Sequence, residues 1–568
     1  MENLILKLRK NKIGIHLDQG ALRLDIPKHL DATEILEEIK KNKNELIKFI
    51  ENTQSFNSTY KVIEKAPEKE YYTLSSAQKR MYFLYEYNKT SLNYNTPQLV
   101  CLNGELDIDL LKEVFNTLVM RHESLRTIFK IVNEEPVQKI VSNLEIDIEV
   151  FKITESEESQ VIQNFVRPFD LNNGPLIRVG VIHLTERKHI LMVDMHHIIT
   201  DGVSDSILVK EFMALYKGET LSPLSLQYRD YAEWQQKNNQ QLEISEQKNF
   251  WLDMFKEETQ PINLPTDFKR PQVKGHNGAT ASFSIENEQA RKLKSINEDL
   301  GSTGFMMFLS VYYILLYKLT NQEDIVIGTP VAGREHEDLN DMIGMFVNTL
   351  PLRNQLKGND TFRAFLLDIK ANTLACIRNQ SYQYEALIDE LKVERDTSRN
   401  PLFDILFSYQ NFIEEELDIP GLKLSAYQKE DMISKFDMSL TTTEKKDQFT
   451  FKISYSVDLF TEQTIHRFIT YYKRIVTAVI ENPDTKLSEI DILSDKEKSQ
   501  LLEGFNATDV EFTKCNSVLE LFESQVSKTP DALAIVNKDT TLTYQELNDQ
   551  VDQMSAYLLT KKDVELEE

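Results

Sequence analysis

Helical and strand-like spacings of hydrophobic residues alternate along most of the 568-residue chain. Between residues 72 and 493 the two patterns follow one another without an obvious repeat, which predicts an α/β body of two lobes. The longest apolar stretch, residues 305–317, reads FMMFLSVYYILLY and is thirteen residues long. It is shorter than the roughly 20 residues that cross a bilayer, so it predicts a buried helix and no membrane span.

The first 55 residues form a small predicted unit of their own. Residues 3–12 have helical spacing, and residues 13–26 alternate apolar and polar positions on both sides of Asp18-Gln19-Gly20, which predicts a β-hairpin. Residues 33–51 return to helical spacing. A polar segment, residues 56–70, is the predicted linker to the body.

A second predicted linker, residues 496–514, precedes a short final piece, residues 515–568. Its pattern predicts a helix at 517–530, a strand at 533–536 and a helix at 543–559. We expect the chain to stop within a domain at this end.

Composition and charge exclude several classes of protein. Hydrophobic residues make up 41% and charged residues 27% of the chain, as in a soluble globular protein. The formal net charge of −25 opposes a nucleic-acid partner, because binding phosphates requires clustered Lys and Arg. The N-terminus lacks the pattern of a secretory signal, and three widely separated cysteines predict neither a disulfide nor structural zinc. These features predict a cytoplasmic protein.

Two adjacent histidines, His196 and His197, end an apolar run at residues 189–198 (HILMVDMHHI). Neighbouring residues of a strand point to opposite faces, which argues against a metal site that needs both imidazoles on one side. Gly202 allows a tight turn after this strand, and Ser204 is a candidate cap for a helix over residues 204–216.

An imidazole beside an acid and a helix N-terminus is a reasonable general base, because histidine exchanges protons near neutral pH. The free amides of that helix could stabilise an oxyanion. The alternative is a pair of hydrogen-bonded core histidines, and the local pattern leaves both interpretations open.

The segment MHHIITDGVS resembles the HHxxxDG signature of nonribosomal peptide synthetase condensation domains. Further motifs of that family occur in the family's order. They are LSSAQKRMYFL (74–84), RHESLRTIF (121–129), YRDYAEW (228–234), IVIGTPVAGREHEDLNDMIGMFVNTLPLR (325–353) and NQSYQYEALIDEL...SRNPLFDILFSYQN (379–411).

The resemblance implies two chloramphenicol-acetyltransferase-like lobes in a V, an N-lobe at residues 71–250 and a C-lobe at residues 251–495, with a tunnel between them. The implied enzyme joins a donor acyl or peptidyl thioester to an acceptor aminoacyl thioester. Each substrate arrives on the 4'-phosphopantetheine arm of a partner carrier protein, and no cofactor binds the domain itself. The sequence around the histidines looks like the subtype that joins an L-donor to an L-acceptor.

The resemblance also implies roles for individual residues. His197 would position or deprotonate the acceptor amine, within a catalytic motif that also contains His196, Asp201 and Gly202. Asp201 would support the fold by pairing with Arg334. Asn348 would add structural support to the site.

The flanks resemble the neighbours of a condensation domain. Residues 1–55 resemble the docking domains that capture a C-terminal segment of an upstream synthetase subunit, so we expect the donor to arrive in trans. An acidic segment would suit the basic residues around the hairpin, which are Lys7, Arg9, Lys10, Lys12, Arg23 and Lys28. Residues 515–568 resemble the start of an adenylation domain without its phosphate and substrate motifs, so the chain should not activate amino acids.

Rival interpretations stay open within the resemblance. An epimerisation domain shares the histidine motif but normally follows a carrier domain. A heterocyclisation domain would carry two aspartates in place of the histidine motif, which His196 and His197 exclude. A free CoA-dependent acyltransferase would leave the flanks without a purpose, and a non-catalytic scaffold of the same fold would not need His197.

Overall fold

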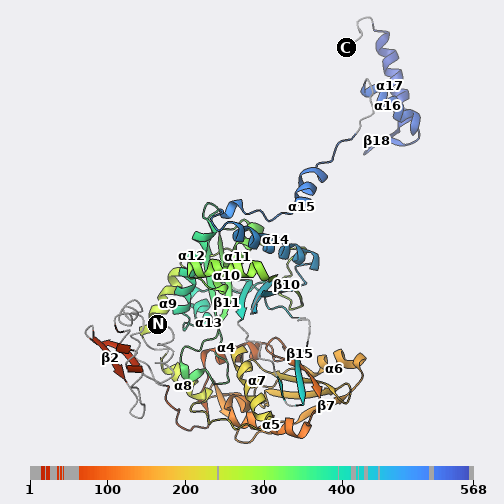
Figure 1. Ribbon diagram of the computed structural model, residues 1–568. Coiled ribbons are helices and arrows are strands. Elements are labelled where there is room, and N and C mark those ends of the chain that lie inside the picture. Colours follow the sequence, from red (N-terminus) through yellow and green to blue (C-terminus); the bar gives the residue numbers. More distant parts are fainter. Residues whose placement is uncertain are drawn as a thin grey trace. The chain divides into compact units, whose positions relative to one another are not determined.

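The computed structural model describes residues 14–18, 21–25, 35–36, 39–40, 43, 63–238, 242–394, 396–410, 418–419, 421–427, 433–445, 448–510 and 517–561. The chain divides into two compact units, Met1–Ile492 and Leu493–Glu568, whose helices and strands are drawn in Figure 1. The two predicted lobes therefore lie in the first unit, apart from the last residues of the predicted C-lobe.

A six-stranded mixed sheet organises the first half of the first unit, with the strand order β14-β15-β4-β9-β8-β7. Strand β9 pairs antiparallel with both β4 and β8, whereas β7 pairs parallel with β8. Helices α5 and α7 pack against each other and share a hydrophobic core with this sheet. The elements are β4 (Gln98–Gly104), α5 (Ile108–Arg121), β7 (Ile148–Lys152), α6 (Glu158–Phe165), β8 (Ile177–His183), β9 (Lys188–Met195), α7 (Gly202–Tyr216), β14 (Asp418–Ile419) and β15 (Leu422–Ala426).

Strands β14 and β15 come from the segment assigned to the C-lobe, but they belong to the first sheet. β15 pairs antiparallel with β4, and in Figure 1 this cyan strand lies among orange ones. Gly104 has φ 146°, and a Cβ at this position would overlap the carbonyl oxygen of Gly421, so this close pairing requires glycine. The predicted boundary at residue 250 therefore does not separate the two lobes fully, because β14 and β15 return to the first sheet.

The second half is built on another six-stranded sheet, with the order β10-β17-β16-β13-β11-β12. Strands β11, β13 and β16 run parallel, and the remaining pairs are antiparallel. The elements are β10 (Gly278–Glu286), α10 (Asn287–Leu300), α11 (Gly304–Thr320), β11 (Asp324–Val331), β12 (Asn348–Gln355), α12 (Phe362–Arg378), β13 (Ile405–Gln410), β16 (Met438–Lys445), β17 (Gln448–Ser456) and α14 (Glu462–Glu481).

Helix α11 confirms the buried helix predicted from residues 305–317. Thr303 caps its N-terminus by accepting a hydrogen bond from the amide of Met306, and every residue from Met306 to Leu316 is buried. A helix that is apolar on all sides belongs in a core, and α11 packs against α12 and α14. In the described part of the chain no single helix is long and apolar enough to span a bilayer, although α10 and α11 together, bent by 106°, meet that criterion.

A three-stranded sheet with the order β3-β6-β5 and several further helices complete the described body. Helix α8 contacts both β3 and α4, so motifs distant in sequence meet here. These elements are β3 (Tyr72–Thr73), α4 (Ser76–Tyr87), β5 (Thr127–Val132), β6 (Glu135–Ile140), α8 (Tyr228–Asn238), α9 (Leu242–Met254), α13 (Tyr384–Leu391) and the 3-10 turns Glu123–Arg126, Glu155–Glu157, Glu337–Leu339 and Leu487–Glu489.

The hairpin predicted at residues 13–26 is confirmed. Strands β1 (Gly14–Asp18) and β2 (Ala21–Asp25) pair antiparallel, from Gly14 with Asp25 to Asp18 with Ala21. Arg23 lies on β2 and is exposed. The helix predicted at residues 3–12 lies outside the described residues, as do Lys7, Arg9, Lys10, Lys12 and Lys28.

The second unit contains the predicted helix, strand and helix, and adds an unpredicted strand that forms a hairpin. The predicted linker at residues 496–514 is helical where it begins. The elements are α15 (Asp495–Ser499), a π-helical turn (Gln500–Gly504), α16 (Val518–Lys528), β18 (Leu533–Asn537), β19 (Thr540–Thr543) and α17 (Tyr544–Leu559).

Candidate functional site

The two histidines follow directly after β9, a strand that is paired on both sides in the first sheet. Strand β9 ends at Met195, and an isolated bridge joins His196 to Asn95. The amide of His196 donates to the carbonyl of Leu176, whereas the amide of His197 donates to the carbonyl of Tyr94. Backbone hydrogen bonds to the segments on both sides of β9 therefore fix the positions of both histidines.

His196 is a core residue with 5% of its surface exposed. Its Nδ1 accepts a hydrogen bond from the amide of Ile198 at 3.1 Å, and its ring lies against those of Tyr94 and Phe169. Burial lowers the pKa of His196 to about 3, and His197 acts in the same direction. His196 is therefore an uncharged structural side chain.

His197 is only partly buried and lines a large cavity. Its Nδ1 lies 2.7 Å from the carbonyl oxygen of Thr200. A carbonyl only accepts, so Nδ1 carries the proton and Nε2 is left as the proton acceptor. Burial lowers the pKa of His197, and the cation of Lys435 lowers it further. The hydrogen bond to Thr200 acts in the opposite direction. The imidazole is thus neutral and suited to accept a proton.

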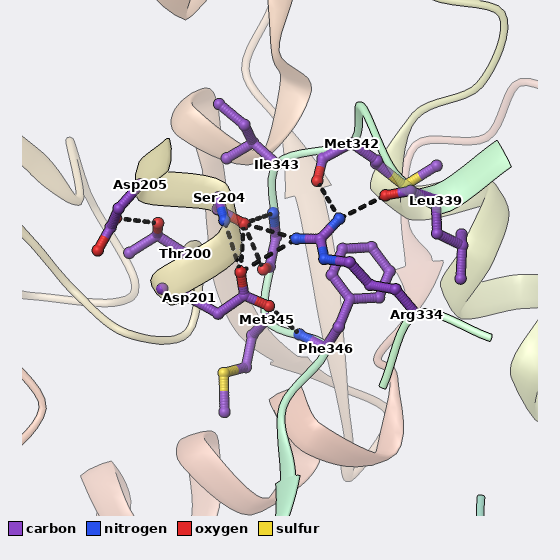
Figure 2. A network of polar contacts seen from close by, with 12 residues as sticks. Thr200, Asp201, Ser204, Asp205, Arg334, Leu339, Met342, Ile343, Met345 and Phe346 are labelled. Carbon is purple, nitrogen blue, oxygen red and sulfur yellow. Dashed lines mark hydrogen bonds and ion pairs between the residues drawn. The ribbon is translucent and has the colours of Figure 1, made fainter. Parts of the chain in front are cut away.

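Thr200 and Asp205 support His197 and were not predicted from the sequence. Thr200 Oγ1 donates a hydrogen bond to Asp205 Oδ1 at 2.9 Å, an interaction shown in Figure 2. Asp205 lies on α7, so this contact fixes the loop that carries the histidine to the helix that follows it. Polar residues such as Thr200 and Asp205 are common in and beside such motifs, so the sequence pattern did not single them out.

Asp201, rather than the predicted Ser204, caps helix α7. Asp201 Oδ1 accepts from the amide of Ser204 at 2.8 Å and from its hydroxyl at 2.7 Å, and Oδ2 accepts from the amide of Phe346 at 3.1 Å. Ser204 Oγ in turn accepts from the amide of Gly344 at 3.0 Å. Ser204 therefore connects the helix to the second half of the chain instead of capping it.

Arg334 forms the ion pair with Asp201 that the sequence analysis predicted. Arg334 Nη2 lies 3.0 Å from Asp201 Oδ1 and 2.9 Å from Ser204 Oγ. Its Nη1 donates to the carbonyls of Leu339 and Met342, and the guanidinium stacks 4.0 Å from the ring centroid of Phe346. The two charged side chains are 4% and 0% exposed. Figure 2 shows this closed network, which joins the two halves of the first unit.

Asn348 holds the chain that follows α12. Its Nδ2 donates to the carbonyls of Gln380 and Tyr382, and its Oδ1 accepts from the amide of Tyr384 at 3.3 Å. Tyr382 and Tyr384 both line the cavity. Asn348 therefore supports the cavity wall through side-chain hydrogen bonds to backbone atoms.

Gly202 does not form the tight turn that its sequence position suggested. It is the first residue of α7, and its φ does not lie in the left-handed region. A Cβ at this position would meet no atom within 4 Å. The backbone here would accept other residues, so nothing in the conformation or packing requires a glycine.

The cavity has a volume of about 2180 Å³ and is lined by residues from both halves of the first unit. Of His196, His197, Asp201 and Gly202, all of which are described, only His197 belongs to the lining. The structure therefore separates the motif into one residue that faces the cavity and three that do not.

Four further residues of the cavity lining were not selected from the sequence, namely Arg80, Tyr94, Glu385 and Lys435. Arg80 on α4 forms an ion pair with Glu385 on α13 at 2.9 Å. Lys435 Nζ lies 4.9 Å from the ring centroid of Tyr94. Arg80 stands inside a recognised motif and could have been singled out, whereas nothing in the sequence pattern marks Lys435.

No group of three or more His, Cys, Asp or Glu side chains suited to a metal ion occurs among the residues that the structure describes. Cys101 is partly buried, Cys376 is buried, and both are free thiols.

The model of the condensation-domain family matches residues 68–502. The chain therefore belongs to the condensation-domain family of nonribosomal peptide synthetases, which confirms the prediction from the motifs.

Particular relatives agree with this assignment. The chain is 42% identical to gramicidin S synthase 2 of Brevibacillus brevis over 503 residues, covering 88% of this chain and 11% of that protein. It is 40% identical to bacitracin synthase 3 of Bacillus licheniformis over 567 residues, covering 98% of this chain and 9% of that protein. The chain thus spans about a tenth of the length of each of these two relatives.

Solved structures show the same fold. A four-domain nonribosomal peptide synthetase bound to AMP and glycine aligns with a TM-score of 0.76 at 21% identity, covering 90% of this chain and 40% of that one. The X-domain in complex with OxyB, from teicoplanin biosynthesis, aligns with a TM-score of 0.70 at 24% identity, covering 77% of this chain and 99% of that one. The mixed α/β condensation-domain fold is therefore established for the first unit.

Proposed function

We propose that this chain forms an amide bond between a carrier-bound donor thioester and a carrier-bound aminoacyl acceptor. The observation that carries the proposal is His197, a neutral imidazole with Nδ1 held by Thr200, which lines a cavity shared by both halves of the first unit. We expect this cavity to receive the two substrates and the ends of the two phosphopantetheine arms that carry them as thioesters.

The reaction needs an oriented, uncharged amine. The acceptor nitrogen attacks the donor carbonyl, the C–N bond forms, and the C–S bond then breaks to release a thiolate. His197 Nε2 holds the proton that the amine loses and returns it to the leaving thiolate. Holding both thioesters in one cavity supplies most of the remaining rate enhancement, because the reaction no longer depends on a bimolecular encounter.

Substituting His197 by Ala tests this function directly. With both carrier proteins loaded, we expect product formation to fall on the order of 10²-fold or more, the range for a lost general base. Mass spectrometry of the acceptor carrier measures the dipeptidyl product. His466→Ala, which removes an exposed imidazole on α14, is the matched control.

The alternatives predict different results in the same assay. Product formed by His197→Ala at the wild-type rate would exclude the catalytic role and favour a scaffold. Inversion of a carrier-bound residue without amide formation would identify an epimerisation domain. A modest loss that depends on the acceptor would indicate that His197 only positions the amine.

The proposal includes the L-donor and L-acceptor subtype and two lobes arranged in a V. Support for the subtype comes from the sequence around His197 and from residues 343–353 (IGMFVNTLPLR). A donor carrier loaded in parallel with L- and D-aminoacyl groups tests it, and a preference for the D-form would contradict it.

We further propose that residues 1–55 form a docking domain that recruits the donor subunit in trans. Strands β1 and β2 form a two-stranded ladder with no third strand among the described residues, and an extended peptide can join such an edge. Residues 1–50 contain ten Lys and Arg against eight Asp and Glu, in contrast to the acidic chain as a whole. This favours an acidic C-terminal segment as the partner.

Exposed ion pairs are screened by salt and worth about 0.2–1 kcal/mol each, so docking should be weak and sensitive to ionic strength. Deleting residues 1–55 should abolish transfer from the upstream subunit at low concentration and spare condensation with a fused donor carrier. Equal transfer by the truncated and full-length chains would contradict the docking role.

Residues 515–568 are proposed as the start of an adenylation domain. Apolar side chains on α16 and α17, among them Val518 (82% exposed) and Leu559 (76% exposed), suit a surface that is covered by further protein. By itself this piece should support no amino-acid-dependent ATP–pyrophosphate exchange.

A further inference from the structure

Lys435 is held in a fixed loop that directs its side chain to the cavity. The neighbouring Ser434 and Asp437 are buried, with exposures of 2% and 1%. The amide of Ser434 donates to the carbonyl oxygen of His276 at 2.9 Å, and the carbonyl of Lys435 accepts from Asn400 Nδ2 at 3.1 Å. Between these anchored residues the Lys435 side chain is accessible, and the space it reaches is the cavity.

A buried charged network fixes this loop. Asp437 accepts from Arg270 Nη1 at 3.1 Å and lies 3.5 Å from Lys274 Nζ. The amide of Asp437 donates to the carbonyl of Asp404, whose carboxylate pairs with Arg399 at 2.7 Å. Such a shell restricts the position of a functional side chain, which is what a preorganised site requires.

Lys435 and His197 reach the same part of the cavity from opposite halves of the first unit. Lys435 Nζ lies 4.9 Å from the ring centroid of Tyr94, and the carbonyl of Tyr94 accepts from the amide of His197 at 2.8 Å. All three residues line the cavity. Within the described residues no ion pair joins the Lys435 ammonium to a carboxylate, so its charge is available to a bound substrate.

We propose that Lys435 is a further catalytic residue, whose ammonium group stabilises the negative charge that develops on the donor thioester carbonyl oxygen. This inference rests on the proposed function. As the acceptor nitrogen bonds to the carbonyl carbon, the C=O π pair moves to oxygen, and the ammonium donates a hydrogen bond to that oxyanion. When the carbonyl re-forms, the C–S bond breaks and its electron pair leaves with sulfur, which takes the proton held by His197.

The surroundings set the pH range over which Lys435 can act. Desolvation by the surrounding protein lowers the pKa of Lys435 to about 8, and the cation of Arg80 acts in the same direction. The titratable groups around it are Arg80 on α4 with its partner Glu385 on α13, Tyr94 after α4, His196 and His197 after β9, and His276 before β10. The ammonium form therefore predominates below about pH 8 and is lost above it.

The test compares wild type, Lys435→Met and Lys435→Arg in steady-state condensation assays, over a range of concentrations of carrier proteins loaded with each proteinogenic L-amino acid in turn. Losing one oxyanion donor typically lowers kcat on the order of 10²–10³-fold, so Lys435→Met should show that loss with little change in KM. In wild type the rate should decline above about pH 8. Lys435→Arg should recover part of the rate and move this decline to higher pH, because a guanidinium stays charged.

Lys292→Met, which removes an exposed lysine on α10 that is not part of the cavity lining, is the matched control and should keep the wild-type rate. Equal kcat in Lys435→Met and wild type would overturn the inference while leaving the proposed function intact. A higher KM with unchanged kcat would overturn it as well, because Lys435 would then only bind substrate. If Lys435→Met is unfolded at the assay temperature, Lys435→Arg decides the question. A rate of Lys435→Arg that declines at the same alkaline pH as the wild-type rate would then overturn the inference. No amide from wild type would overturn the proposed function and this inference together.

Discussion

His197 and Asp201 lie four residues apart in one loop, yet their surroundings are opposite. His197 faces a cavity, with one fixed hydrogen bond to Thr200 and its other nitrogen unused within the loop. Asp201 is enclosed, and both of its oxygens accept hydrogen bonds from groups of the protein. The same short motif therefore supplies one side chain for chemistry and another for assembly, so substitutions at the two positions should change different properties.

The largest expected effect on stability is that of Asp201→Ala. Removing one partner of a buried ion pair leaves the Arg334 guanidinium unpaired and costs roughly 3–5 kcal/mol. Solubility, melting temperature and activity should all fall, as measured by denaturant unfolding and the condensation assay. Asp107→Ala removes an exposed helix cap on α5 and should cost only about 0.5–2 kcal/mol. A stable, folded and inactive Asp201→Ala would instead indicate a direct role in catalysis.

A smaller effect on stability is expected from His196, and this effect depends on pH. The folded-state pKa of His196 lies near 3 and that of an unfolded histidine near 6.5, so the unfolded state binds the extra proton between these values. Stability is therefore lost as the pH falls below about 6.5, by at most about 1.4 kcal/mol per pH unit. His196→Gln should flatten this part of the stability profile, and an unchanged slope between pH 6.5 and 5 would contradict the assignment.

Ser204→Ala should cost less than Asp201→Ala, because it leaves no charge unpaired. Its hydroxyl accepts from Arg334 and from the amide of Gly344, and leaving such buried donors unsatisfied costs about 1–3 kcal/mol. Chemical denaturation measures the loss. Ser206→Ala, at an exposed position on the same helix, should be close to neutral, and equal effects of the two substitutions would show that the contacts between the halves contribute nothing.

The smallest effect on stability is expected at His197 itself. Its side chain faces the cavity, so His197→Ala removes little packing and should change the free energy of unfolding by about 0.5 kcal/mol or less, as surface substitutions do. The same variant is expected to lose most of its activity. A loss of stability similar to that of Asp201→Ala would remove the distinction between the two residues.

The sequence predicted elements well where a local pattern is sufficient. The apolar run at residues 305–317 is buried in α11, and the alternation at residues 13–26 forms the β1–β2 hairpin. The opposite faces of a strand predicted that His196 and His197 would separate, and their surroundings differ as expected. The pairing of Asp201 with Arg334 came from the family resemblance, and the structure contains it.

Only the tertiary structure decided which distant segments meet. Strand β15 has an ordinary strand pattern, but its partner is β4, more than 300 residues earlier, because alternation identifies a strand and not its neighbour in a sheet. Asp201 rather than Ser204 became the helix cap because the Ser204 hydroxyl is engaged by Arg334 and Gly344. Lys435 reaches the surroundings of His197 through a loop that is fixed by an ion pair between the neighbouring Asp437 and the sequence-distant Arg270. Local spacing determines the elements and the chemistry available, whereas long-range packing determines which side chains share a cavity.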